Sequence, residues 1–142
     1  MKRKTTDELF KNLSQEKNLQ NYLNANSPEF EHSSLQEELN RLLTEHGQKK
    51  ADVIRLSNLD PVYAYQIFDG SKSNPARSKL LALCISMGAS LKETQKILRL
   101  GHWEPLYPRS IRDSIIIYAI EHQTPVMDVN SILYDMHMEL LR

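Results

Sequence analysis

Apolar residues along this chain recur at the three- and four-residue spacing of an α-helix, and they do not alternate as in a strand. Leu35, Leu39 and Leu42 fall at positions i, i+4 and i+7, which places them on one face of a helix. Further along, Leu80–Ile85 is an unbroken apolar run within residues 75–87, a segment longer than a typical strand. The pattern predicts an all-α protein with a central helix over 75–87 that is buried on nearly all sides.

Glycine and proline mark where the predicted helices begin and end. All 4 glycines follow an apolar helical stretch, where a left-handed residue ends a helix easily. Five of the 6 prolines open such a stretch, because proline tolerates the first helical turn. Besides the central helix and the one that begins near Leu35, these signals predict helices over residues 7–13, 15–24, 49–57, 61–69, 90–98, 108–122 and 125–140.

The helices fall into three zones. Residues 1–33 form a polar N-terminal helical extension, which either docks on the rest of the protein or serves as a mobile arm for a partner. Residues 34–100 hold five short helices with brief connections, as in a single domain. Residues 101–142 hold a pair of longer helices with a wide apolar face. Two alternatives stay open for that pair, packing on the core or forming a homodimer interface.

Size and composition exclude several classes of protein. The chain has 142 residues, of which 40% are hydrophobic and 25% charged, as in ordinary globular proteins. It has no apolar run long enough to span a membrane. Its basic start, Met1–Lys4, leads into polar residues and not into the apolar core of a signal peptide. We therefore expect a cytoplasmic protein with no membrane partner.

The segment 50–70 predicts a helix-turn-helix arrangement. Its first helix carries Val53 and Ile54 for inward packing, and Asn58 stands at a turn position that requires positive φ. Asp60 precedes Pro61, an arrangement typical of a capped helix start. Three further residues suit packing of the second helix against the first, namely Ala64, Ile67 and Phe68.

The order of these motifs resembles the phage-lambda-repressor-like (Cro/Xre) family. In the typical sequence of that family, the second helix of the motif ends with Ile/Leu-x-Asn-Gly. Lys/Arg-x-Pro follows, and a later helix closes with Leu-Gly-Val-Ser-Leu. The chain carries Ile67–Gly70, Lys72–Pro75 and Met87–Leu91 at those places. The resemblance covers about residues 34–100 and implies a five-helix DNA-binding domain, with the N-terminal arm and two C-terminal helices as additions.

The resemblance also implies which residues would contact DNA. In that family the second motif helix enters the major groove, where Gln66 suits adenine, Val62 suits a thymine methyl group, and Tyr65 suits either a phosphate or a base. The basic residues that would bind phosphates are Lys49, Lys50, Arg55, Lys72, Arg77 and Lys79. The expected function is a sequence-specific transcriptional regulator that binds double-stranded DNA as a homodimer on a pseudo-palindromic site.

Two acidic residues and a missing arginine keep an alternative function open. Asp60 and Asp69 would repel phosphates, although Asp60 is also explained as a helix cap. The helix over 61–69 has no arginine to recognise guanine. The alternative is a non-catalytic adaptor that keeps the helix-turn-helix scaffold but binds a protein.

Catalytic and metal-binding patterns are missing from the sequence. The 5 histidines lack the spacing of metal ligands, and no glycine-rich phosphate loop or nucleophile motif is present. The single cysteine, Cys84, falls within the apolar run and is expected to be a buried structural thiol. We therefore expect no enzyme activity, no cofactor and no metal site.

The formal net charge of zero conceals an uneven distribution. There are 18 basic and 18 acidic residues in the chain, but residues 46–80 carry 6 basic against 3 acidic side chains. The excess of positive charge thus falls on the predicted DNA-binding motif, and the flanking segments cancel it. This balance favours a modest, local contact with nucleic acid that salt weakens.

Overall fold

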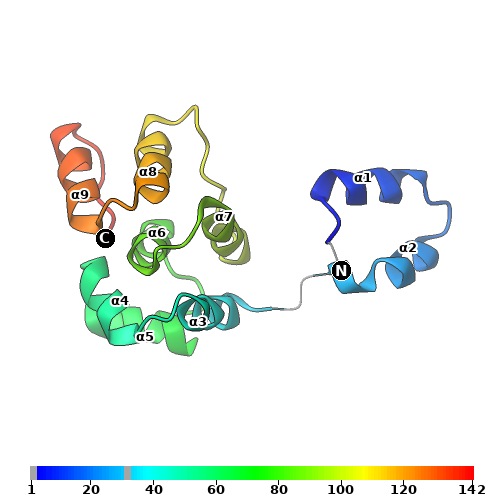
Figure 1. Cartoon of the computed structure of the whole chain (residues 1–142), viewed down its shortest axis with the longest axis horizontal. Helices are drawn as coiled ribbons and strands as arrows, with labels where there is room; N and C mark the ends of the chain where they lie inside the picture. The colour runs from blue at the N-terminus through cyan, green and yellow to red at the C-terminus, as the bar shows by residue number, and fades with distance from the viewer. Residues whose placement is uncertain (1–2, 31–32) are drawn as a thin grey trace. The chain divides into compact units, whose positions relative to one another are not determined.

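The computed structural model describes residues 3–30 and 33–142, and within these ranges it contains helices and turns but no strand. The predicted all-α class is therefore confirmed. The chain divides into two compact units, Met1–Ser33 and Ser34–Arg142. Figure 1 labels the α-helices, which are α1 (Thr6–Gln15), α2 (Leu19–Ala25), α3 (Leu35–Glu45), α4 (Lys50–Ser57), α5 (Pro61–Asp69), α6 (Arg77–Met87), α7 (Leu91–Leu100), α8 (Ile111–His122) and α9 (Val126–Asp135).

The first unit contains α1, α2 and a 3-10 turn over Ser27–Glu29. Thr5 begins α1 with a reciprocal capping box, and the Arg3 guanidinium lies 3.5 Å from the Glu29 carboxylate. No residue of α1 is buried, and α2 buries Tyr22 alone. The unit is therefore held together more by polar contacts than by an apolar core.

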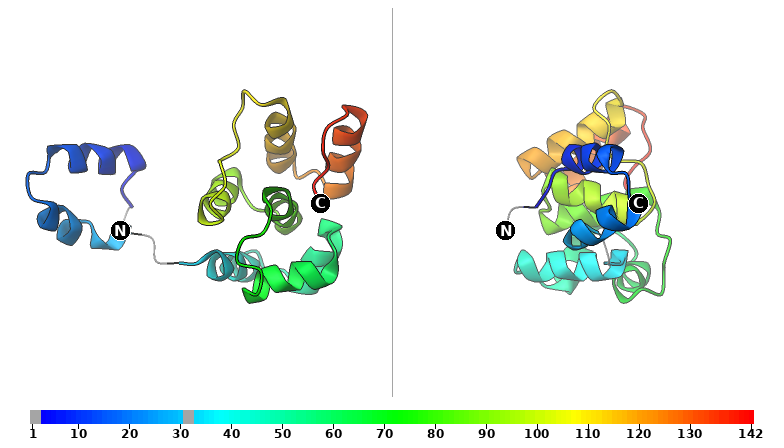
Figure 2. Two further views of the ribbon diagram at one scale, coloured as in Figure 1. Left: turned by 180° about the vertical axis from the view of Figure 1, so that it is seen from behind. Right: turned by 90° about the vertical axis from the view of Figure 1, so that its right-hand side faces the viewer.

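The second unit is built around α6, which packs against α4, α7 and α9. Helices α3, α4 and α5 lie on one side of α6, and α8 and α9 lie on the other (Figures 1 and 2). The side chains of Leu80–Cys84 are all fully buried, which confirms the predicted central helix. The helix begins later than predicted, at Arg77, and Ala76 is its N-cap.

The turn between α4 and α5 has the geometry that the sequence predicts. Asn58 has φ 61° and ψ 19°, the left-handed conformation that asparagine tolerates better than most residues. The Ser57 hydroxyl donates to the Ile54 carbonyl at 2.6 Å and accepts from the Leu59 N–H at 3.2 Å. Since Leu59 is itself buried, polar and apolar contacts together hold α5 against α4.

The connection from α7 to α8 is anchored by side chains that bind its backbone. The Gln95 side chain donates to the Leu106 carbonyl at 3.0 Å and accepts from the Leu106 N–H at 2.7 Å. The Trp103 indole donates to the Pro75 carbonyl at 2.9 Å. Leu106 is buried, whereas most of the Tyr107 side chain is exposed. The apolar anchor of this connection is therefore Leu106, which the sequence did not single out.

The predicted last helix, over 125–140, is too long. Helix α9 ends at Asp135, and His137, with φ 58°, turns the chain back. The Asn130 side chain accepts from the Leu141 N–H at 2.8 Å and donates to its carbonyl at 3.4 Å. This pairing satisfies the Leu141 backbone outside a helix and lets its side chain become fully buried.

A buried carboxylate, Glu38, links α3 to α7. The Arg41 Nε lies 3.1 Å from both Glu38 oxygens, and the Lys96 Nζ lies 3.4 Å from Glu38 Oε2. The hydrogen bond from Arg41 is the main cause that lowers the pKa of Glu38, and it outweighs the effect of burial. Glu38 therefore remains ionised inside the protein.

We predict that Glu38→Gln lowers the free energy of unfolding by about 2 kcal/mol at pH 7, because charge-assisted hydrogen bonds are lost. The folded-state pKa of Glu38 is depressed, so its stabilisation is present above the unfolded pKa of about 4.3 and disappears as the pH falls through the folded pKa. Urea unfolding at pH values from 7 down to 3 should show the difference between the two proteins shrinking. Glu45→Gln is the control, because Glu45 also pairs with Arg41 but is exposed. A difference that is independent of pH would contradict the assignment.

Candidate nucleic-acid interface

The outward side of α5 consists of Val62, Tyr65, Gln66 and Asp69, which we call the α5 outer face. These positions follow helical spacing, and the intervening Ala64, Ile67 and Phe68 face the core. Val62 is 67% exposed and Tyr65 is 44% exposed, whereas Gln66 is partly covered. The three residues predicted to contact bases are therefore brought together on one side of one helix.

The start of α5 is fixed by its own sequence. Asp60 accepts a hydrogen bond from the Tyr63 N–H at 3.1 Å, and Pro61 occupies the first helical position. This confirms the predicted cap. The Asp60 carboxylate thus has a structural role at the helix end, where a negative charge is favourable.

Two of the predicted phosphate-binding lysines meet on one aromatic ring. The Lys72 and Lys79 ammonium groups lie 5.4 and 4.8 Å from the centre of the Tyr63 ring. Cation–π contacts of this kind contribute about 0.5–1 kcal/mol each at exposed sites. Tyr63 therefore packs and gathers two positive charges beside α5, and Tyr65 is the more exposed of the two tyrosines.

The other two lysines stand at the start of α4. The Lys50 Nζ lies 5.5 Å from the centre of the Phe68 ring, which belongs to α5. Lys49 is the N-cap of α4, and its side chain makes no capping hydrogen bond. We call Lys49, Lys50, Lys72 and Lys79 the flanking lysines. Among the residues that the structure describes, no carboxylate lies within ion-pairing distance of any of these four.

Arg55 and Asp69 reduce the positive character of this region. The Arg55 guanidinium lies 3.4 Å from the Asp52 carboxylate one turn earlier on α4, and both side chains are largely exposed. Asp69 accepts from the Ser71 N–H at 2.7 Å, and its hydrogen bonds from Ser71 lower the pKa of Asp69. The α5 outer face therefore ends in a carboxylate that is ionised at neutral pH.

Arg77 stands apart from the other predicted contact residues. Its guanidinium makes two hydrogen bonds of 3.0 Å to the Asp113 carboxylate of α8. It also donates to the Glu104 carbonyl at 3.1 Å and to the Pro105 carbonyl at 3.2 Å. Asp113 accepts in addition from the Tyr107 N–H at 3.0 Å. Arg77 thus ties α6 to α8 and to the connection before α8.

Other candidate chemistry is limited in the described part of the chain. Cys84 is fully buried, and burial raises the pKa of its thiol to about 12. Within residues 3–30 and 33–142 no group of three or more His, Cys, Asp or Glu side chains is arranged to hold a metal ion. None of the helices in these ranges combines the length and the apolar character needed to cross a membrane.

Comparisons with known protein families, curated proteins and solved structures find no match for this chain. We therefore infer function from the geometry of the α5 outer face and the flanking lysines.

We predict that Arg77→Ala lowers the free energy of unfolding by about 3–5 kcal/mol, because it leaves the buried Asp113 carboxylate without its cation. Lys79→Ala, two residues further along the same helix, should cost less than about 1 kcal/mol. Urea unfolding of both variants measures the two effects. The double variant Arg77→Ala/Asp113→Ala should cost less than the sum of the single variants. Additive costs would show that the two side chains do not act as a pair.

Proposed function

We propose that this protein binds double-stranded DNA with α5 in the major groove and acts as a transcriptional regulator in the cytoplasm. The observation that carries the proposal is the α5 outer face, which is accessible and lies beside four lysines that form no ion pair with any carboxylate of the described residues. A helix of this kind fits the major groove, and lysines at its sides suit the phosphates on either strand. The likeness of residues 34–100 to the lambda-repressor-like family supports the same assignment.

Three residues of the α5 outer face have roles that their chemistry suits. The Gln66 amide matches the N6 and N7 atoms of adenine, and Val62 matches the methyl group of thymine. Tyr65 is placed to donate its hydroxyl to a phosphate or a base edge. These contacts favour A·T base pairs, because α5 carries no arginine for guanine.

The start of α4 supports a phosphate contact. Lys49 leaves the first N–H groups of α4 without a side-chain cap, and exposed N–H groups at a helix start favour an anion. Lys50 adds a positive charge beside them. Because Asp69 opposes phosphates at the far end of the α5 outer face, we expect modest affinity that depends strongly on salt.

A second function, an adaptor that binds a protein, is favoured by the apolar character of the α5 outer face. Val62 and Tyr65, its two large hydrophobic members, are both exposed, and aromatic residues are enriched at protein interfaces. The two functions differ in how strongly salt weakens binding. The flanking lysines supply most of the binding free energy only when they contact phosphates.

We predict that the full chain binds A·T-containing duplexes selected from a random library, with a salt slope of about −4 if four lysines contact phosphates. Lys72→Ala and Lys79→Ala should each weaken binding of every duplex and reduce the slope by about one. Gln66→Ala should weaken binding by about 1–3 kcal/mol, and it should relax sequence preference at one base pair only. Fluorescence anisotropy titrations at several salt concentrations measure all three effects.

The control is Lys92→Ala, which removes an exposed lysine from α7 and should leave affinity and slope unchanged. Failure to bind any duplex at low salt would reject the DNA proposal in favour of the adaptor. Equal losses of DNA affinity in the Lys92→Ala and Lys72→Ala variants would show that binding is not located at α5.

A further inference from the structure

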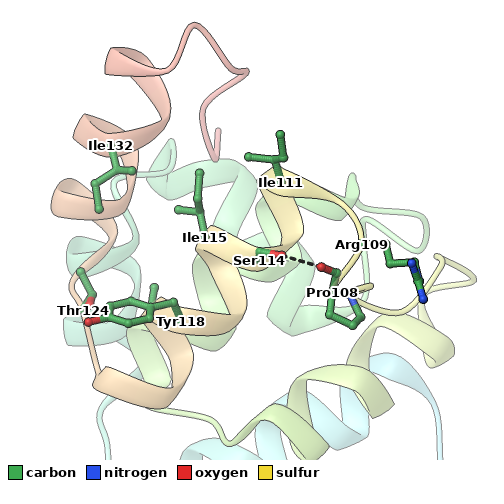
Figure 3. Close-up of a pocket in the computed structure, with 9 residues that line it drawn as sticks. Pro108, Arg109, Ile111, Ser114, Ile115, Tyr118, Thr124 and Ile132 are labelled. Carbon is green, nitrogen blue, oxygen red and sulfur yellow. Dashed lines mark hydrogen bonds between the residues drawn. The ribbon is translucent and has the colours of Figure 1, made fainter.

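An apolar hollow lies on the surface between α8 and α9. Its volume is about 400 Å³, and Figure 3 shows the side chains around it, with Ile132 of α9 facing the side chains of α8. The residues that matter for its shape are Ile111, Ile115, Tyr118, Ala119, Thr124 and Ile132. The hollow and the exposed apolar side chains beside it make this surface a candidate interaction site.

The exposed side of α8 has the spacing of a helix-pairing seam. Ile111, Ile115, Tyr118 and His122 are separated by four, three and four residues, which is the spacing of core positions in a coiled coil. Ile111 is 62% exposed and Tyr118 is 60% exposed. The His122 ring stacks on the Tyr118 ring at 3.8 Å, which orders the end of this seam. We call these four residues the α8 seam.

We propose that the α8 seam binds the α8 seam of a second copy of this chain in antiparallel orientation. A two-fold axis midway along the seam places Ile115 against the partner's Tyr118 and Ile111 against the partner's His122. The same patch contains both protruding side chains and the hollow beside Ala119 that receives them. A contact between two copies requires such self-complementarity, whereas a contact with a different protein does not.

The charges at the two ends of α8 favour the antiparallel arrangement. Arg109 is exposed just before α8, and Glu121 is exposed near its end. Antiparallel pairing brings each Arg109 to within about one helical turn of the partner's Glu121. Parallel pairing would set Arg109 against Arg109 instead. The helix dipoles are also better matched when the two helices run in opposite directions.

The size of the seam sets the expected strength of the dimer. A standard stable interface buries about 800 Å² per partner, and a single 12-residue helix face is smaller than that. We therefore expect a dimer that forms at micromolar concentrations.

The dimer goes beyond the proposed DNA binding and does not depend on it. Helices α5 and α8 lie on opposite sides of α6 (Figure 1), so pairing through α8 leaves both α5 outer faces free and turned away from each other. Adjacent half-sites on one duplex need both recognition helices on the same side of the dimer. An α8 dimer would instead hold two separate stretches of DNA.

Sedimentation velocity of the full chain between 1 and about 200 µM tests the proposal. The wild type should shift from monomer to dimer over this range. Ile111→Glu/Tyr118→Glu should weaken dimerisation at least 10-fold, because it buries charges in the seam. Met127→Glu is the matched control, since Met127 is 70% exposed on α9 and does not line the hollow. All of these side chains are exposed, so unfolding transitions should match the wild type.

A charge exchange tests the orientation. Arg109→Glu and Glu121→Arg should each weaken the dimer, and the double variant should recover it, because the pair is restored with its signs reversed. A wild type that stays monomeric throughout, or a dimer that survives Ile111→Glu/Tyr118→Glu, would overturn the proposal. Failure of the double variant to recover would overturn the antiparallel arrangement. None of these outcomes bears on DNA binding, which the anisotropy titrations measure separately.

Discussion

The burial of α6 on all its sides is the constraint on which the second unit depends. Leu80–Cys84 present apolar atoms in every direction, so no single neighbouring helix is enough to remove them from water. Helices α4, α7 and α9 each cover part of α6. Helix α9 and the returning C-terminal segment, with Leu141 fully buried, therefore belong to the same core as the helices of residues 34–100.

Covering α6 leaves two helices with faces that the core does not use. Helix α5 turns Ala64 and Phe68 inward and leaves Val62 and Tyr65 to solvent. Helix α8 buries Ile116 and Ile120 and leaves Ile111 and Tyr118 exposed. The two faces differ in their surroundings, because lysines gather beside α5 whereas the exposed side of α8 borders an apolar hollow. That difference is why we assign nucleic acid to one face and a second copy of the chain to the other.

Polar side chains decide how firmly these faces are held in place. Arg77 and Asp113 connect α6 to α8, and Glu38 connects α3 to α7 through Lys96. Both carboxylates are buried, so their contribution to the stability of the fold depends on the cations with which they are paired. Helix α8, which carries one of the two candidate surfaces, is thus fixed by a buried ion pair that lies outside that surface.

Local signals in the sequence were sufficient for the order of the helices and for much of the α5 region, but not for the bounds of α6, α8 and α9. The left-handed Asn58 and the Asp60 cap each depend on residues within a few positions of one another, and so they could be predicted without a structure. The outer face of α5 follows from helical periodicity for the same reason. The particular lambda-repressor-like arrangement remains an expectation based on resemblance.

Long-range contacts could not be predicted in this way. Arg77 and Lys79 are two basic residues on the same helix, yet one meets Asp113 and the other meets the Tyr63 ring. Asn130 reaches Leu141 only because the chain turns back at His137. Residue type and spacing indicate where helices lie and which sides are apolar, because those preferences are local. Which charges remain free for a ligand is decided by the fold alone, since it depends on partners that are distant in the sequence and meet only when α6 is enclosed.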